Sequence, residues 1–336
     1  MRASNPMANF PGRKVNLGCE IESTRGTVES TMSYWFPLLE ADFFEKNSQV
    51  KNTASYGVKE QSVGMDIVQK SANGAFTFNL TDKTIGVFLK SLLGTLSSAA
   101  NADVSGNVYD HTITVDQATV STPSFTLAYA DDVQDYSYAL AVAKSIELNA
   151  ELGEYVKATV EFVSKKGATA SHTVSITSEN KFRMQDVTFK LATTQSGLTA
   201  ASAINIKAIN LNIENNARED FSLGSVDPTD VVAPSFVITG TVTLNYGATT
   251  YRDLFTAGTA YALRLDIKNL DVTIGTAANP QLRIDLHNIT FPDYSQDRNL
   301  DDLVTQELSF EGHYKTADSK SLTCTLTNLV TAYTAS

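Results

Sequence analysis

Apolar and polar residues alternate and then change period within one stretch of the chain, residues 74–94, GAFTFNLTDKTIGVFLKSLLG. Phe76, Phe78 and Leu80 alternate with polar residues, which predicts a strand with one buried face. Apolar residues then recur at helical spacing, and Gly94 stands where a left-handed residue ends a helix. The stretch therefore predicts a strand that runs into a helix. The apolar stripe of this helix is Ile85, Phe88, Leu89, Leu92 and Leu93.

The same change of period recurs in weaker form at residues 240–258, GTVTLNYGATTYRDLFTAG. Aligned without a gap, the positions Gly74, Thr77, Asn79 and Thr84 of the first stretch match Gly240, Thr243, Asn245 and Thr250 of the second. The stripe of the second helix is Tyr251, Leu254 and Phe255. A register that holds through two changes of period predicts an internal duplication, with one strand and one helix in each copy.

The rest of the chain divides around these two passages. Residues 1–12 are polar and contain two prolines, which is typical of a terminal arm. A first unit spans 13–166 and a second spans 204–336. The connector between them, 167–203, is poor in large apolar groups, with one or two strands expected near residues 184–191. Period-two alternation prevails in both units, so we predict a mainly β protein with one flanking helix per unit.

Residues 34–44, YWFPLLEADFF, form the most aromatic passage of the chain. One interpretation is a short core helix after Pro37. The other is a loop that carries an aromatic surface to another subunit or ring, because Tyr and Trp offer large contact area at low entropic cost. The residues proposed for that contact are Tyr34, Trp35, Phe36, Leu38, Leu39, Phe43 and Phe44. Weak alternation from residue 48 to 73 then predicts a long hairpin.

Composition limits the class of protein. A chain of 336 residues is long enough for about two domains, and 42% hydrophobic with 19% charged residues is typical of a globular protein. The net charge of −11 argues against a groove that grips nucleic acid, but it allows a protein that stands close to DNA without binding it. No run is long enough to span a membrane and the first residues lack a signal-peptide core, so we expect assembly in the cytoplasm.

The sequence contains no pattern that carries a known chemistry. The two cysteines, Cys19 and Cys324, alternate with apolar neighbours and are expected to be buried thiols. No two of the four histidines have the spacing of a zinc pair, and His287 is expected on the polar face of a strand. Asp110 beside His111 suggests a triad, but no serine stands in a G-x-S-x-G turn. We therefore expect no catalytic residue, metal or cofactor, and a function that resides in surfaces.

Several short motifs occur in an order that resembles a known family. They are ESTRGT at 22–27, FLKSLLG at 88–94, LGSVDP at 223–228 and DDLVTQELSFEGHY at 301–314. In this order the chain resembles the major tail tube proteins of long-tailed bacteriophages. The resemblance implies two tandem β-sandwich or half-barrel domains, each with one flanking helix. It also implies that long strands of neighbouring chains join into a closed β-barrel ring.

The resemblance further implies a structural virion protein of the tail. Its rings would stack into a tube that conducts genome DNA and holds the tape-measure protein, with tail completion and tip proteins as further partners, all assembled in the host bacterial cytoplasm. If both copies face the lumen, three chains form a pseudo-sixfold ring; if one does, six chains are needed. The alternative function is a tail-tip or fibre β-sandwich module that binds a host-surface glycan or receptor. An enzyme is the third possibility.

Overall fold

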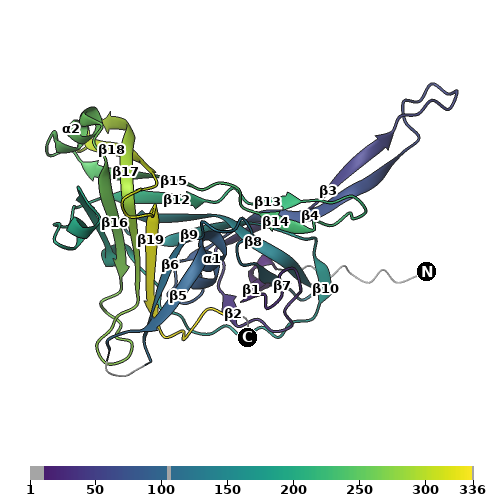
Figure 1. Ribbon diagram of the computed structural model, residues 1–336, viewed down its shortest axis with the longest axis horizontal. Helices are drawn as coiled ribbons and strands as arrows, with labels where there is room; N and C mark the ends of the chain where they lie inside the picture. Colours follow the sequence, from purple (N-terminus) through teal and green to yellow (C-terminus); the bar gives the residue numbers. More distant parts are fainter. Residues whose placement is uncertain (1–10, 104–106, 335–336) are drawn as a thin grey trace.

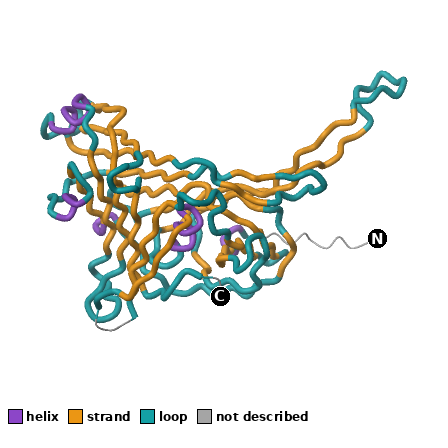
Figure 2. Tube along the Cα trace, in the orientation of Figure 1, coloured by secondary structure: helices purple, strands orange, loops and turns teal. Residues whose placement is uncertain are grey.

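The computed structural model describes residues 11–103 and 107–334, so most of the predicted arm at 1–12 lies outside the described residues. Strands dominate, as Figure 2 shows. The strands of the first half are β1 (Asn16–Ile21), β2 (Tyr34–Phe36), β3 (Glu40–Asn52), β4 (Gly64–Asn79), β5 (Gly94–Ala100), β6 (Tyr109–Val115), β7 (Phe125–Ala130), β8 (Asp135–Glu151) and β9 (Lys157–Ser164). Those that follow are β10 (Ala168–Ala170), β11 (Val187–Ala192), β12 (Ala208–Glu214), β13 (Arg218–Asp220), β14 (Asp230–Val232), β15 (Val237–Asn245), β16 (Tyr261–Lys268), β17 (Gln281–Asp297), β18 (Thr305–Gly312) and β19 (Leu322–Asn328).

Two α-helices accompany the strands, α1 (Ile85–Leu93) and α2 (Thr250–Ala257). Three short 3-10 helices are η1 (Gly12–Lys14), η2 (Met184–Asp186) and η3 (Ser196–Thr199). The mainly β class with two flanking helices is therefore confirmed. Helix α1 lies in the middle of the molecule, whereas α2 lies at one end, beside β17 and β18 (Figure 1).

The architecture is built on eight antiparallel strands that follow one another in the order β3-β4-β9-β8-β12-β15-β18-β17, here called the long sheet. Its central junction is the pair β8 and β12, where Leu148 lies opposite Leu211. Because β8 belongs to the first half and β12 to the second, both halves of the chain share one continuous sheet. The sheet is open within the chain, with β3 at one edge and β17 at the other.

The order of pairing in the second half repeats the order in the first. Strand β8 pairs with β7, β10 and β9, and β17 pairs in the same way with β16, β19 and β18. Each of these two long strands also shows a register shift at its middle, after Ala143 in β8 and after Thr290 in β17. Strand β3 with its neighbour β4 likewise matches β12 with β15.

Individual backbone hydrogen bonds at matching positions of the two halves repeat as well. The Leu39 N–H donates to the Thr77 carbonyl at 2.9 Å, and Lys207 donates to Thr243 at 2.7 Å. In the same way Leu80 donates to Val156, and Tyr246 donates to Val304. These bonds fix which positions of the two halves correspond.

A matched glycine lies opposite a phenylalanine inside the sheet in each half. Gly74 lies opposite Phe162 in β9, and Gly240 lies opposite Phe310 in β18. A Cβ atom at Gly240 would lie 2.3 Å from the Phe310 ring, so a larger residue there must displace that ring. A Cβ atom at Gly74 would instead lie 2.3 Å from the Phe43 backbone in β3, so the two aligned glycines both avoid a close contact, but with different neighbours.

The two helices differ in burial. Every residue of α1 except Lys90 is buried, including its whole predicted stripe, whereas α2 has no buried residue and its stripe is only half-buried. Both end as expected at glycines with positive φ, 93° at Gly94 and 60° at Gly258. The N-cap residue of α1, Thr84, makes no capping bond with its own side chain, and the polar partner at this end of the helix is Glu179 in the connector. Its carboxylate accepts from the Thr84 N–H at 3.0 Å and from the Thr84 hydroxyl at 2.6 Å. Local sequence cannot show a cap that is distant along the chain.

The aromatic passage forms strand β2 and the start of β3, and not a helix. Trp35 and Phe36 are each 2% exposed. Trp35 lies opposite Gly18 of β1, where a Cβ would approach the indole to 2.7 Å, so a glycine makes the room for this ring. Phe36 packs among Phe76, Phe78 and Phe88 with ring centroids 5.2 to 5.7 Å away.

Candidate assembly surface

His111, which stands beside Asp110 in the sequence, belongs to a buried network of hydrogen bonds. His111 Nδ1 lies 2.8 Å from the Ser98 hydroxyl and Nε2 lies 3.1 Å from the Asn328 side-chain oxygen. The predicted partner, Asp110, points to the opposite face and binds Asn101, because successive strand residues alternate between faces. Burial lowers the pKa of His111.

The Tyr333 ring covers His111 with a centroid distance of 4.9 Å, and its hydroxyl lies 2.8 Å from the Asn328 amide. With His111 fully buried, a substrate has no access to this chain of groups. We assign it to anchoring the C-terminal segment against α1, where Tyr333 also donates to the Lys83 carbonyl.

His287 and the two cysteines are also buried within the fold. His287 was expected on the surface but is buried, and its Nδ1 lies 2.8 Å from Asp318 Oδ2, because the segment after β18 folds over this part of β17. Both cysteines are buried and free, and burial raises the pKa of each thiol. Within residues 11–103 and 107–334 no three potential ligands gather to hold a metal ion, and no helix there is long and apolar enough to cross a membrane.

The two edges of the long sheet are the most unusual surface. Among the described residues, β3 pairs only with β4, and the part of β17 beyond its register shift pairs only with β18. Each edge therefore presents a row of backbone N–H and C=O groups. Such rows are templates for pairing with another strand, and long exposed edges are otherwise a risk for aggregation. An edge of this length is consistent with a partner strand from another molecule.

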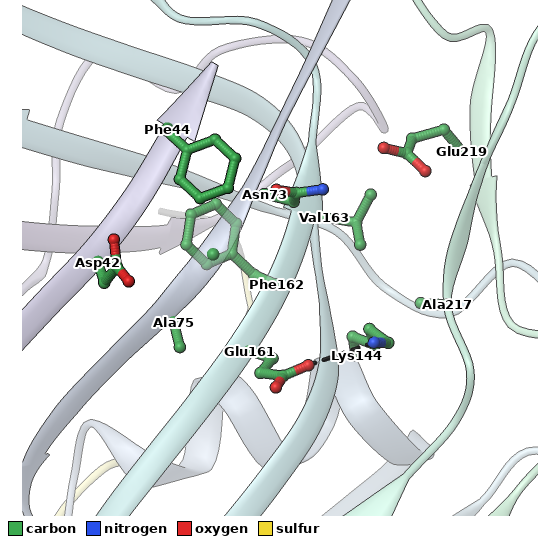
Figure 3. A pocket seen from close by; sticks show the side chains of 11 residues that line it. Asp42, Phe44, Asn73, Ala75, Lys144, Glu161, Phe162, Val163, Ala217 and Glu219 are labelled. Atoms are coloured by element: carbon green, nitrogen blue, oxygen red, sulfur yellow. Dashed lines mark hydrogen bonds and ion pairs between the residues drawn. The ribbon is translucent and has the colours of Figure 1, made fainter. Parts of the chain in front are cut away.

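One face of the long sheet packs on the core and the other is polar. The polar face carries hydroxyl, amide and carboxylate groups, among them Asn73, Thr77, Glu147, Asn149, Thr159, Glu161, Asn210, Asn212, Glu214, Thr241, Thr243, Asp293, Ser295, Glu307 and Ser309. Lys144 is one of the few cations close to this face. Its amine lies 3.3 Å from the Glu161 carboxylate (Figure 3) and 3.9 Å from that of Glu214. Carboxylates thus outnumber amines across this face.

The predicted hairpin at 48–73 is present and forms the far part of β3 and β4. It projects away from the body as a separate arm, as the upper right of Figure 1 shows. Apolar side chains on the arm remain exposed, namely Val50, Tyr56, Val58, Val63, Met65, Ile67 and Val68. An arm with this many exposed apolar groups resembles an interaction surface more than an isolated hairpin. In the sequence, the signal for this surface is the set of apolar residues within an otherwise polar hairpin.

The residues of the aromatic passage that were proposed for a contact between subunits differ in their exposure. Trp35 and Phe36 are inside the chain and unavailable to a partner, while Leu39 and Phe44 are 53% and 57% exposed. Tyr34, Leu38 and Phe43 are half-buried. Phe44 stands at the base of the arm, opposite Asn73 in the pairing of β3 with β4, and lies near it in Figure 3. Sequence reasoning did not identify the free edge of β17 or the apolar residues of the arm.

Residues 12–312 match the model of a protein family described as phage tail tube protein. The match runs from η1 to the end of β18 and so includes every strand of the long sheet. The comparison with curated proteins gave no match.

Proposed function

Because this chain belongs to the phage tail tube protein family, whose members are structural virion components that assemble into a tube, we propose that the long sheet is the wall of that tube. The observation that carries the proposal is one open sheet of eight strands whose two edges have no partner strand among residues 11–103 and 107–334. Pairing the β3 edge of one chain with the β17 edge of the next closes the wall into a ring, and closure removes both edges.

The number of chains per ring follows from the repeated pairing order. Each half of the chain contributes four strands to the long sheet, and the two halves have the same order of neighbours. We propose that the halves are duplicated tube domains. The sequence divides them as 13–166 and 204–336, joined by 167–203, but we assign the end of this connector to the second copy, because β11 pairs with β16 as β1 pairs with β7. Three chains then supply the six domains of a ring, and a hexamer of chains is not needed.

The polar face of the long sheet is proposed to line the lumen. Duplex DNA carries a phosphate charge about every 1.7 Å along its axis. A wall with more carboxylates than amines repels that charge, and its hydroxyl and amide groups remain hydrated. Genome DNA therefore slides during ejection without being held. The same lumen contains the tape-measure protein before ejection, with tail completion and tip proteins at the ends.

Stacking of rings is proposed to use the β3–β4 arm. A stable contact buries about 1,000 Å² or more, and the exposed apolar groups of the arm offer such an area when they meet another ring. Of the aromatic passage, Leu39 and Phe44 remain as contact residues. Repeating this head-to-tail contact along an axis generates a filament. We place this assembly in the host bacterial cytoplasm, as for other parts of a virion tail.

Electron microscopy of the purified chain by negative stain tests the function. Stacked rings that form hollow tubes are expected, and native mass spectrometry of single rings should give three chains. A discrete particle that never stacks, even at high concentration, would instead favour a tail-tip or fibre module. A ring of six chains would contradict the duplicated arrangement while leaving the tube function in place.

A further inference from the structure

The seam between the two halves of the chain contains a groove that residues of both halves line. Its walls come from the second half and include Met184, Val187, Ile204 and Ile206. Residues 150–152, at and just beyond the end of β8 of the first half, partly cover it, and Leu152 remains 61% exposed. The space left is about 270 Å³. One half of the chain therefore partly closes a groove of the other.

The first half has the same groove, which Ile176 of the connector also lines, but among the described residues no end of a long strand lies across it. It is lined by Gly12, Val15, Phe36 and Leu38 together with Leu39, Glu40 and Phe43, and its volume is about 820 Å³. The positions that line the two grooves correspond, because Leu17 pairs with Phe36 in the first half and Phe189 pairs with Ile204 in the second. On this correspondence Val15 matches Val187 and Leu38 matches Ile206.

The segment that corresponds to 150–152 in the second half follows the end of β17. Strand β17 is the counterpart of β8, and Ser145 and Asp293 are the first paired residues after their register shifts. Seven residues further on, Leu152 corresponds to Leu300. Leu300 is 99% exposed, which is unusual for a leucine. Its segment, 298–300, continues from the free edge of β17.

We propose that residues 298–300 of a second copy of this chain cover the groove beside β3, as residues 150–152 partly cover its counterpart within the chain. This inference rests on the proposed function, since it specifies the seam that closes the ring. It also fixes the partner strand, because the segment can reach the groove only if β17 of the second copy lies along β3.

The internal seam also gives the register of this pair. Glu214 lies opposite Ser145, and their counterparts are Lys46 and Asp293. Lys46 of one copy therefore lies opposite Asp293 of the next, a pair of opposite charge. The adjacent Asn215 N–H donates to the Lys144 carbonyl at 3.0 Å, so Glu214 and Ser145 form a non-hydrogen-bonded pair. The Cα separation expected for Lys46 and Asp293 is then about 4.5 Å.

Disulfide crosslinking of assembled full-length chains tests the register. Cα atoms about 4.4 to 6.8 Å apart can be bridged. Lys46→Cys with Asp293→Cys in one chain should give a ladder on non-reducing gels that ends at three chains. The chain cannot link to itself, because the two positions lie on opposite edges of its sheet. The control, Asp42→Cys with Asp293→Cys, is displaced by four residues and should not link.

Leu300→Asp tests the groove. It should lower the yield of the Lys46–Asp293 crosslink by about threefold or more, because the counterpart Leu152 is 61% exposed and Leu300 therefore gains only part of the stabilisation of a fully buried leucine. Leu270→Asp, at another exposed loop leucine, is the matched control and should leave the yield unchanged. Both leucines are exposed within the chain, so neither change removes a core contact.

The outcomes separate this inference from the function on which it rests. Tubes that form without the matched crosslink, or with the displaced one, would overturn the register but leave the tube intact. Equal yields for the Leu300 and Leu270 variants would overturn the groove contact. Failure of the unsubstituted chain to form rings at all would remove the proposed function itself.

Discussion

Replacing Trp35 distinguishes a core role from a surface role for the aromatic passage. The side chain is 2% exposed and packs in a cluster with Met32, Ala128 and Ala130, over the glycine at position 18. Trp35→Ala should therefore lower the free energy of unfolding by about 3–5 kcal/mol, the usual loss for truncating a buried Trp. Any effect on tubes should follow from this loss of stability.

The comparison variant is Phe44→Ala, since Phe44 is 57% exposed at the base of the arm. Its free energy of unfolding should stay within about 0.5 kcal/mol of the parent value. Tube length should nevertheless fall, because we place Phe44 at a contact between copies. The two variants thus predict opposite combinations of stability and assembly.

Urea unfolding followed by far-ultraviolet circular dichroism measures stability in both variants. Tryptophan fluorescence is unsuitable because Trp35 is the only tryptophan of the chain. Tube length is measured on micrographs of the same samples. If Trp35→Ala unfolds at the urea concentration of the parent and yet forms no tubes, the core assignment is refuted and the indole acts at a surface.

Three further predictions concern charge. Arg264 and Asp285 form a buried bidentate pair at 2.6 and 2.8 Å, so Asp285→Ala should cost about 3–5 kcal/mol in urea unfolding, and the double change Arg264→Met with Asp285→Leu should recover most of it. Burial raises the pKa of Asp82 in the folded protein, so the stabilisation from its protonated form is present below the unfolded pKa of about 4 and is lost as pH rises through the folded pKa. Asp82→Asn should reduce this loss of stability with rising pH, and a variant whose stability depends on pH as the parent's does would contradict the assignment. The proposed register places Asp42 opposite Asp297, so Asp297→Asn should raise ring yield in sedimentation at low salt, and the gain should shrink as added salt shortens the Debye length to about 8 Å; equal yields for Asp297→Asn and the parent at low salt would argue against the register.

Local period was enough to predict several elements of this protein. The two strand-to-helix passages, the α1 stripe, the glycine ends of both helices and the hairpin at 48–73 follow from residues close together in sequence. Period two and period 3.6 are properties of short segments, and they survive in a sequence without knowledge of its partners.

Only the tertiary structure decided which segments meet. The burial of Trp35 depends on Gly18, the cap of α1 comes from Glu179, and the junction of β8 with β12 makes one sheet of two halves. Each of these joins residues far apart along the chain, and neither period nor composition carries that information. The free edges of β3 and β17 are a consequence of the whole pairing order, so they become visible only when every other strand has found its neighbour.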